Sequence, residues 1–381
     1  MDQKLFERYP AIVDLQNKAK KRIPHFAWEY LNSGTGIEDC LDRNRQAFSK
    51  VILVPQFMQG EFEPEINNSL FGIEYSAPFG IAPVGLTGLM WPGAEKILAR
   101  TAAKARIPFS LSTVATETPE LIGPLSNGMG WFQLYPPRRE ALRQNLLKRA
   151  QDSGFTTLLI TADVPIGSRR ERQIRAGVNV PPKITLRTLY HSTIRPSWTL
   201  ATLGHGQPRF KTLEKYLDAK DMQNMVSYVG KELGGTLDWP YVEAVRKEWN
   251  GPIVLKGLLE TSQAEQAVDV GVDGIFVSNH GGRQFDGAPA ALDVLPAMKS
   301  AVGNKIKILF DSGVRTGLDI ARALALGADF VLLGSAFMYG VAALGERGGD
   351  HVVDILTEDL KNNMKQLGCR ELKEIQNRLR Q

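Results

Sequence analysis

Short apolar runs recur along the chain, and each is bounded by glycine, proline or polar residues. Between most of them, apolar residues recur with helical spacing, as in GAEKILARTAAKA and GLDIARALALG. Strands that alternate with helices predict an α/β fold with a parallel sheet covered by helices, and eight such units favour a closed (β/α)8 TIM barrel over an open, doubly wound sheet. The runs expected as strands are FGIAPV (79–84), FSLST (109–113), WFQLY (131–135), TLLITAD (157–163), PIVLKG (252–257), GIFVSNH (274–280), KILFDSG (307–313) and FVLLGS (330–335).

The rest of the chain is arranged around this barrel, and we expect one domain over residues 1–381. Residues 1–76 form an N-terminal extension with helical periodicity in AIVDLQNKAKKRI and HFAWEYLNSG, followed by a polar stretch that resembles a hairpin. The barrel occupies residues 77–345, and residues 346–381 form a closing amphipathic C-terminal helix. Within the barrel, residues 172–235 make a long insertion. Neither end contains enough apolar residues for a core of its own.

Composition is that of an ordinary globular protein, with 43% hydrophobic and 23% charged residues. The two cysteines, Cys40 and Cys369, lack the spacing of a zinc site, so we expect two reduced thiols and no bound metal. The first residues have no apolar signal core, and the longest weakly polar run, 330–345, is shorter than the roughly 18 residues that a spanning helix needs. These features favour a cytoplasmic location.

The net charge of +5 is concentrated in one segment. No Asp or Glu occurs between Arg172 and Leu213, and this stretch also carries aromatic residues. Such a segment is either a long solvated lid or a surface that contacts anionic lipid headgroups, with its aromatic rings at the interface. No nucleic-acid-binding motif accompanies the charge, so a nucleic-acid partner is not expected. The basic residues are Arg172, Arg175, Lys183, Arg187, Arg195, Arg209 and Lys211, and the aromatic ones are Tyr190, Trp198 and Phe210.

Polar residues and glycines follow nearly every predicted strand. In a barrel of this kind the carboxyl ends of the strands converge on the active site. A single polar residue at such a position usually satisfies the backbone, but a complete ring of them indicates a functional site. The residues are Pro83, Val84 and Gly85; Ser112 and Thr113; Gln133 and Tyr135; Thr161 and Asp163; Lys256; Ser278, Asn279 and His280; Asp311, Ser312 and Gly313; and Gly334 and Ser335.

The loops after the last two strands, SGVRTG and LGSAFMYG, have the features of a phosphate site. Glycines free backbone N–H groups there, a helix begins after each loop, and Arg315 could add a bidentate contact. The alternative is that these residues only form the turns between strand and helix and bind no phosphate. The sequence lacks GxGxxG at the start of a βαβ unit and lacks GxxxxGK[ST], so the usual dinucleotide and nucleoside-triphosphate signatures are missing. We therefore expect a phosphorylated cofactor or substrate other than a dinucleotide or a nucleoside triphosphate.

Four kinds of ionisable group are predicted to share the mouth of the barrel. His280 is a base near neutral pH, and Arg283 beside it could hold a carboxylate. Asp163 could orient the imidazole, and Arg170 could supply a second guanidinium. Lys256 comes from a buried strand, where a lysine could form a Schiff base or place a fixed positive charge beside a cofactor.

With these residues in place, the chain resembles the FMN-dependent family that oxidises L-2-hydroxy acids. SNHGGRQFDG (278–287) is close to the family signature, and the likeness extends from about residue 5 to about residue 375. Further matching motifs are IPHFAWEYLNSG, RNRQAF, IAPVGLTGLMWPGAE, LSTVATE, WFQLY, TADVPIGSRRERQ, LKGL and DSGVRTGLDIARALALGAD. The resemblance implies a TIM barrel that holds FMN at the strand mouths and oxidises a 2-hydroxy acid to a 2-keto acid.

The resemblance also implies roles for individual residues. His280 corresponds to the catalytic base, Asp163 to its orienting partner, and Tyr135 to a donor to the substrate hydroxyl. Arg283, Arg170 and Tyr30 correspond to the carboxylate-binding set. Lys256 corresponds to the positive charge that stabilises reduced FMN. The resemblance therefore favours this role over a Schiff base at Lys256. The positions that match FMN contacts are Pro83, Val84, Gly85, Ser112, Gln133, Thr161, Lys256, Ser278, Asp311, Gly313, Arg315, Gly334 and Ser335.

Two departures from the family pattern change these expectations. Ser335 stands where the family usually has an arginine, which removes one phosphate contact and predicts looser FMN binding. Val114 stands where glycolate oxidase has a tryptophan, which leaves room for a substrate side chain larger than hydrogen, as in lactate or mandelate.

The resemblance bears on partners as well. The RPSW piece resembles the segment that attaches lactate and mandelate dehydrogenases to membranes, so we expect peripheral contact with the inner face of the cell membrane. An external acceptor, quinone or cytochrome, would reoxidise FMN, and relatives often form tetramers. Oxidation by oxygen is the first alternative. The second is another phosphate-binding flavin barrel enzyme, such as an isomerase.

Overall fold

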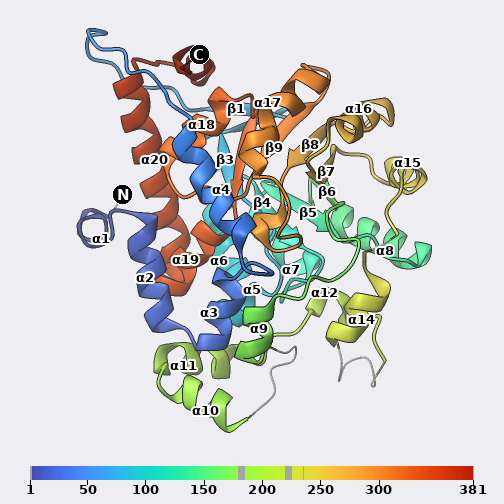
Figure 1. The fold of residues 1–381 in the computed structure, drawn as a ribbon. Coiled ribbons are helices and arrows are strands. Elements are labelled where there is room, and N and C mark those ends of the chain that lie inside the picture. Colours follow the sequence, from blue (N-terminus) through green and yellow to red (C-terminus); the bar gives the residue numbers. More distant parts are fainter. Residues whose placement is uncertain (1, 179–184, 219–224, 235, 381) are drawn as a thin grey trace.

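Eight parallel strands close into a barrel at the centre of the molecule (Figure 1). The computed structural model describes residues 2–178, 185–218, 225–234 and 236–380. Neighbouring strands pair in the order β10-β3-β4-β5-β6-β7-β8-β9, which confirms the (β/α)8 prediction from the apolar runs. The strands are β3 (Phe79–Ile81), β4 (Phe109–Ser112), β5 (Gly130–Leu134), β6 (Thr157–Thr161), β7 (Ile253–Leu258), β8 (Gly274–Val277), β9 (Lys307–Phe310) and β10 (Phe330–Leu333).

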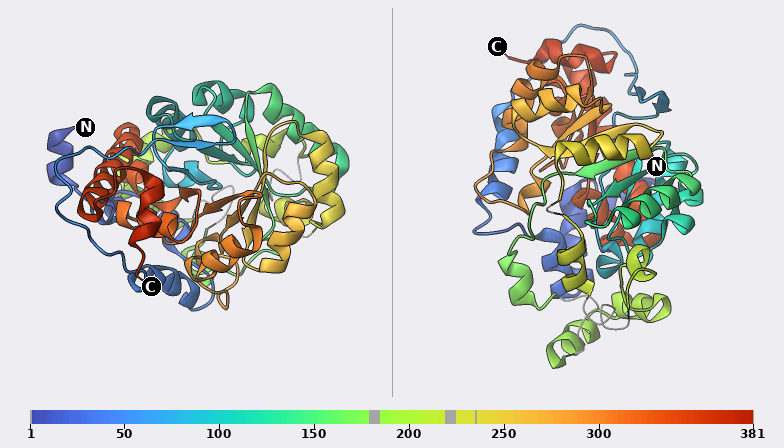
Figure 2. Two further views of the ribbon diagram at one scale, coloured as in Figure 1. Left: turned by 90° about the horizontal axis from the view of Figure 1, so that it is seen from above. Right: turned by 90° about the vertical axis from the view of Figure 1, so that its right-hand side faces the viewer.

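Helices surround the barrel, and the view from above in Figure 2 shows them as an outer layer around the strands. Their apolar faces pack on strands that are buried on both sides, so one continuous core includes the strands and the inner faces of the helices. These helices are α5 (Thr87–Met90), α6 (Ala94–Ala105), α7 (Pro119–Ser126), α8 (Glu140–Asp152), α15 (Trp239–Glu248), α16 (Thr261–Asp269), α17 (Ala291–Val302), α18 (Gly317–Ala325) and α19 (Ser335–Leu344).

The N-terminal extension begins with four helices and ends in the hairpin that the polar stretch predicted. The helices are α1 (Gln3–Arg8), α2 (Ile12–Arg22), α3 (His25–Asn32) and α4 (Asp39–Lys50), and the hairpin pairs β1 (Asn68–Leu70) with β2 (Ile73–Tyr75). Tyr75 covers the amino-terminal end of the barrel, where its hydroxyl accepts a hydrogen bond from Trp131 Nε1 at 3.1 Å.

The C-terminal segment follows α19 through a short 3-10 turn, η2 (Gly345–Arg347). It contains the long helix α20 (Gly348–Leu367) and a final 3-10 helix, η3 (Leu372–Arg378). α20 packs against both α18 and α19. Gly317 allows the close approach to α18, because a Cβ at this position would lie 2.1 Å from the backbone nitrogen of Leu360.

The insertion after β6 folds into several short helices below the mouth of the barrel. They are α9 (Glu171–Ala176), α10 (Leu186–Thr193), α11 (Pro196–His205), α12 (Lys211–Glu214) and α14 (Met225–Glu232). α10 and α11 project from the end of the molecule opposite the C-terminus (Figures 1 and 2). Within the described residues, no helix is both long enough and apolar enough to span a bilayer.

The expectation that the aromatic residues of this insertion lie at a surface is wrong for Trp198 and Phe210. The exposed fraction of Trp198 is only 5%, because its ring packs edge-on against Phe26 and its Nε1 donates to the carbonyl oxygen of Leu89. Phe210 is buried as well, whereas Tyr190 is exposed.

Part of the insertion's positive charge is also neutralised locally. Lys211 Nζ lies 3.0 Å from Glu117, and Arg209 Nε lies 3.1 Å from Glu214. Lys183 lies outside the described residues.

Candidate active site

A cavity of about 1040 Å³ opens at the carboxyl ends of the barrel strands. The extension contributes to its wall through α3 and α4, and the insertion contributes through Phe210 and Leu233. Fifteen residues with a predicted catalytic or binding role line it: Tyr30, Pro83, Val84, Gly85, Val114, Tyr135, Arg170, Lys256, His280, Arg283, Asp311, Gly313, Arg315, Gly334 and Ser335. Five others lie directly behind this wall, each hydrogen-bonded to a lining residue or to one another: Ser112, Gln133, Thr161, Asp163 and Ser278.

His280 and Asp163 form a hydrogen-bonded pair at this wall. Nδ1 of His280 lies 3.0 Å from Oδ1 of Asp163. Because an ionised carboxylate only accepts hydrogen bonds, Nδ1 carries the hydrogen and Nε2 keeps a free lone pair. Lys256 Nζ contacts the second carboxylate oxygen at 3.5 Å and donates to Ser278 Oγ at 3.1 Å. The site therefore contains a neutral imidazole next to a buried carboxylate and a buried ammonium group.

Burial and charge set the protonation states of this group. Burial lowers the pKa of His280 below its ordinary value, an effect that Asp163 opposes and Lys256 reinforces. For Asp163, burial alone would raise the pKa, but Lys256 and His280 outweigh it and hold the pKa at about 2. At neutral pH, Asp163 is consequently ionised and His280 is available as a base.

Unusual backbone geometry places both members of the pair. His280 has a φ of 58°, in the left-handed region that non-glycine residues rarely occupy. Such a conformation costs about 1–3 kcal/mol and is typical of functional sites. Gly257, at a bulge in β7, has a φ of 105°, and a Cβ on it would lie 2.4 Å from Cβ of Asp163. A glycine at 257 therefore lets Asp163 approach Lys256 closely.

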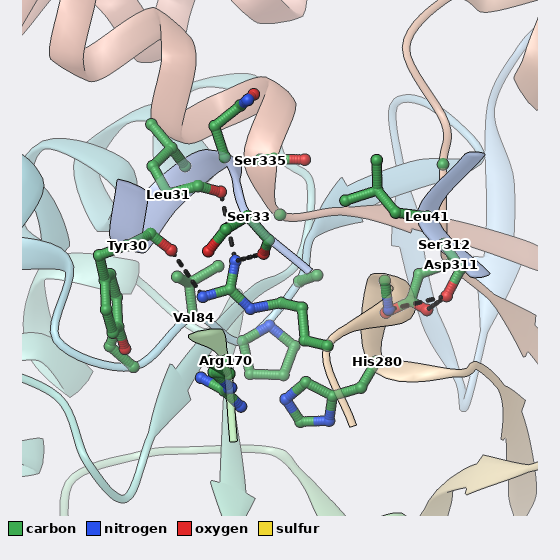
Figure 3. Close-up of a pocket in the computed structure, with 18 of the residues that line it drawn as sticks. Tyr30, Leu31, Ser33, Leu41, Val84, Arg170, His280, Asp311, Ser312 and Ser335 are labelled. Atoms are coloured by element: carbon green, nitrogen blue, oxygen red, sulfur yellow. Dashed lines mark hydrogen bonds between the residues drawn. The ribbon is translucent and has the colours of Figure 1, made fainter. Parts of the chain in front are cut away.

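Arg283 reaches the cavity from the turn η1 (His280–Gly282), and the end of α3 orients its side chain. Its guanidinium donates to the carbonyl oxygens of Tyr30 at 2.6 Å, Leu31 at 3.3 Å and Ser33 at 3.1 Å, as the dashed lines in Figure 3 mark. These carbonyls belong to the negative end of the helix dipole, which suits a cation. Burial, followed by the nearby charge of Arg170, lowers the pKa of Arg283 to about 10, so it remains charged at neutral pH.

Arg170 approaches the same space from the loop before α9, and Figure 3 shows it close to His280. Its Nε donates to Ser168 Oγ at 2.9 Å and its Nη2 donates to Gln284 Oε1 at 2.8 Å. Gln284 was not identified as a site residue, although it lies within the signature SNHGGRQFDG. Two guanidiniums and an imidazole thus face one cavity, a combination that can bind a carboxylate and accept a proton beside it.

Two tyrosines complete this side of the cavity. The hydroxyl of Tyr30 donates to the carbonyl oxygen of Gly85 at 3.0 Å. Burial raises the pKa of Tyr135 well above its ordinary value, although Arg170 lowers it in part, so its hydroxyl keeps its hydrogen and can donate. Val114 is buried against Gly85, where a Cβ would lie 2.6 Å from Cγ2 of Val114.

A row of hydrogen-bonded side chains crosses the ends of three strands behind the cavity wall. Ser112 Oγ donates to Gln133 Oε1 at 2.6 Å, and Gln133 Nε2 donates to Thr161 Oγ1 at 2.7 Å. Each member is buried, and each has its polar atoms paired within the row. The row forms a polar, ordered layer directly behind the cavity wall.

The loops after β9 and β10 form the opposite end of the cavity, where Figure 3 shows Asp311, Ser312 and Ser335. Ser312 and Gly313 both have positive φ, at 83° and 93°, so the chain turns sharply there, and turns after a strand are places where backbone N–H groups can bind an anion. α19 begins at Ser335, and its dipole favours negative charge there. Arg315 lies over the ring of Tyr339, and one of its nitrogens donates to the carbonyl oxygen of Val314.

Arg45 is a cavity residue whose place in the site was not predicted. It extends from α4, donates to the carbonyl oxygen of Gly313 and lies 3.2 Å from Asp319 Oδ2. The motif RNRQAF contains it, but the spacing of an N-terminal helix does not reveal contact with a loop about 270 residues later.

Comparison with known proteins agrees with this geometry. A model of the FMN-dependent dehydrogenase family matches residues 19–381. An L-lactate dehydrogenase from Stenotrophomonas maltophilia is 37% identical over 367 residues, which cover 96% of this chain and 97% of the relative. An L-lactate dehydrogenase from Acinetobacter baumannii is 36% identical over 364 residues, which cover 95% of each protein.

Solved structures give the same result. The monotopic membrane protein (S)-mandelate dehydrogenase superposes with a TM-score of 0.92 at 32% identity, over 97% of this chain and 98% of that one. A mandelate oxidase superposes with a TM-score of 0.83 at 31% identity, over 98% of each. The chain therefore belongs to the FMN-dependent dehydrogenase family, which includes L-lactate and mandelate dehydrogenases, and is an FMN-dependent oxidoreductase.

Proposed function

We propose that this protein oxidises an L-2-hydroxy acid to the 2-keto acid, with His280 as the base, and passes the electrons from FMN to an external acceptor. The observation that carries the proposal is the convergence of the His280–Asp163 pair with Arg170 and Arg283 on one cavity. A flavin-dependent isomerase has no need for two guanidiniums beside an imidazole, whereas a small carboxylate substrate does. The L-lactate and mandelate relatives support the same substrate class.

The lining residues fit FMN in both charge and shape. The phosphate would lie at the loops that carry Gly313, Arg315, Gly334 and Ser335, where positive φ angles and the start of α19 favour an anion. The flavin ring would lie along Pro83, Val84 and Gly85, with the hydrogen-bonded row of Ser112, Gln133 and Thr161 at its polar edge. Gly334 supports this placement, since a Cβ there would lie only 3.1 Å from Cγ2 of Val84 and would crowd the cavity floor. Ser278 and Asp311 would be the remaining residues that contact FMN.

The substrate carboxylate would bind Arg283 and Arg170, with Tyr30 beside them. Arg283 is already held by three carbonyl oxygens, so little side-chain entropy is lost when the substrate docks. Tyr135 would donate its hydroxyl hydrogen to the oxygen on the substrate's Cα. These contacts would leave Cα within reach of His280 and exclude water from the reacting atoms.

His280 Nε2 would accept the proton that leaves the substrate during oxidation. Asp163 keeps Nδ1 protonated and stabilises the imidazolium that results, so the imidazole is held in the tautomer that the reaction needs. When bound, FMN supplies the two-electron acceptor. Lys256 would hold a positive charge near the ring and so favour the negative charge that reduction brings.

The preferred substrate is proposed to have a side chain larger than hydrogen. Val114 is small, and the neighbouring wall from the insertion is apolar, with Phe210, Val229 and Leu233 lining the cavity. Purified enzyme should turn over L-lactate or (S)-mandelate faster than glycolate, measured as kcat/KM over a panel of 2-hydroxy acids. Preference for glycolate would contradict this part of the proposal.

We further propose that α10 and α11 bind the inner face of the cell membrane and that quinone reoxidises FMN there. Large apolar side chains are exposed along these helices, and Arg187 and Arg195 lie among them. The similarity to a monotopic membrane protein supports this orientation. A homotetramer is also proposed and can be tested by light scattering. The exposed apolar residues are Leu186, Leu189, Tyr190, Ile194, Leu200 and Leu203.

Oxidation by molecular oxygen is the second candidate function, and the similarity to mandelate oxidase favours it. The two can be separated by mixing enzyme and substrate with air alone or with a soluble quinone under argon. We expect turnover with the quinone to exceed oxygen uptake. The reverse ratio would identify an oxidase.

A further inference from the structure

Arg172 begins the basic segment of the sequence, but its side chain is directed into the protein rather than toward a partner. It lies on α9, two residues after Arg170, and is 31% exposed. Its Nε lies 2.6 Å from Oε2 of Glu29, and its Nη1 lies 2.8 Å from Oε2 of Glu38. One guanidinium therefore joins α9 to two carboxylates of the N-terminal extension.

Further hydrogen bonds tie the same two segments together at the end of α3. Gln173 Nε2 donates to Ser33 Oγ at 3.1 Å, and Ser33 Oγ donates to the carbonyl oxygen of Glu29 at 2.5 Å. Glu38 accepts from the backbone nitrogen of Gly34 at 2.8 Å. The last turn of α3 is thus fixed from outside by side chains of α9.

That turn is the one whose carbonyl oxygens hold Arg283. Tyr30, Leu31 and Ser33 accept all three of the hydrogen bonds described above for its guanidinium (Figure 3). Arg170 stands at the start of α9, and its backbone nitrogen donates to Thr35 Oγ1 at 3.3 Å, just beyond the same turn. Ser168 links the two arginines directly, because its Oγ accepts from Arg170 Nε and donates to the carbonyl oxygen of Arg283. The relative placement of α9 and α3 contributes to the gap between the two guanidiniums as well, since each helix positions one of them.

We propose that Arg172 is a positioning residue for substrate binding: by clamping α9 to α3 through Glu29 and Glu38, it holds Arg170 and Arg283 at the spacing that a substrate carboxylate requires. The inference rests on the proposed function, since it assigns the carboxylate to these two arginines. Displacements of about 1 Å at such a site change rates and affinities by up to about 100-fold. Arg172 and Glu38 both lie at the wall of the same cavity, but in this scheme neither contacts the substrate or the cofactor.

A positioning role and a purely electrostatic role for Arg172 predict opposite effects of Glu38→Gln on the binding of an anionic ligand. If Arg172 acted only through its charge, Arg172→Gln would weaken the binding of an anion, and Glu38→Gln, which removes a negative charge, would strengthen it. If the clamp matters, both variants loosen α9 from α3 and both weaken binding. Arg169→Gln is the matched control, because Arg169 is the same residue type, lies in the loop just before α9 and has a side chain that is 84% exposed.

The experiment compares the holoenzyme with Arg172→Gln, Arg172→Lys, Glu38→Gln and Arg169→Gln. Binding of oxalate, a small carboxylate without an oxidisable hydroxyl, is followed by the change in flavin absorbance, and KM and kcat are measured with the best 2-hydroxy acid. We expect the oxalate Kd and KM to rise about tenfold in Arg172→Gln and Glu38→Gln, with kcat changed less than KM. Arg172→Lys should be intermediate, and Arg169→Gln should match the wild type.

Unchanged oxalate affinity in both clamp variants, or tighter binding in Glu38→Gln, would overturn the role of Arg172 while the wild type still oxidises its substrate. A wild type that no 2-hydroxy acid reduces would instead overturn the proposed function and this inference with it. If Arg172→Gln fails to fold, Glu38→Gln decides alone, because it removes only one arm of the clamp.

Discussion

The imidazole of His280 donates from Nδ1 to Oδ1 of Asp163 over 3.0 Å, although the two residues are 117 positions apart in the chain. This contact leaves Nε2 as the basic nitrogen in the cavity. Gly257 leaves room for Asp163 in this contact, and His280 makes it from a left-handed backbone conformation. The pair is therefore built by the fold at some cost in local stability.

Replacing Asp163 with asparagine should weaken the base in two ways. The carboxylate that raises the pKa of His280 is lost, so this pKa falls further below its ordinary value, and the amide can stabilise the wrong tautomer. We expect kcat to fall on the order of 100-fold, with FMN still bound. Stopped-flow reduction of the flavin measures this directly.

The pH dependence follows from the same shifts. A protonated His280 cannot accept a proton, so kcat/KM should fall as the pH drops through the pKa of His280 in the free enzyme. Because burial lowers that pKa, the activity plateau should extend below the ordinary histidine value of about 6.5. In Asp163→Asn, the inflection should move to still lower pH. A profile that declines already above the ordinary value would be inconsistent with the lowered pKa.

Ser335 gives a prediction about the cofactor. An arginine at this position, at the start of α19, would add a charge-assisted contact to a phosphate. Ser335→Arg should lower the Kd for FMN roughly tenfold in reconstitution of the apoprotein, followed by flavin fluorescence. Riboflavin, which lacks the phosphate, serves as the control ligand. Equal tightening of both ligands would show that the new side chain does not act on phosphate.

The proposed membrane surface can be tested without touching the cavity. Leu200 and Leu203 are exposed on α11, with Leu203 at 76%. The double change to glutamate should reduce binding to anionic phosphatidylglycerol vesicles at least about tenfold, because two apolar side chains no longer enter the lipid. Met58→Glu is the control, since Met58 is 98% exposed in a loop between α4 and β1. Equal flotation of all three proteins would argue against this surface.

Much of the fold could be predicted because strands buried on both faces give continuous apolar runs, and all eight appeared in the sequence. The polar strand ends also indicated which residues would meet. Contacts between distant segments could not be predicted. The carbonyl oxygens that orient Arg283 belong to a helix about 250 residues earlier, and nothing in the local pattern near Arg283 points to them.

The basic insertion is a second case in which residue types alone do not predict which side chains are buried. Its composition favours a surface, yet Trp198 is buried against Phe26, and Arg172 pairs with acidic residues outside the acid-free stretch. Residue types alone do not distinguish a tryptophan that packs on a helix from one that meets lipid. The exposed leucines of α10 and α11, which carry less sequence signal, are better candidates for that role.

Anaerobic mixing of the FMN-loaded protein with L-lactate or (S)-mandelate tests the central claim most directly, with the visible flavin absorbance as the readout. The wild type should bleach, and His280→Gln should retain FMN while its rate of bleaching falls at least about 100-fold. Rapid bleaching of the variant would contradict the assignment of His280 as the base. A wild-type protein that binds FMN but is bleached by no 2-hydroxy acid would contradict the proposed activity itself.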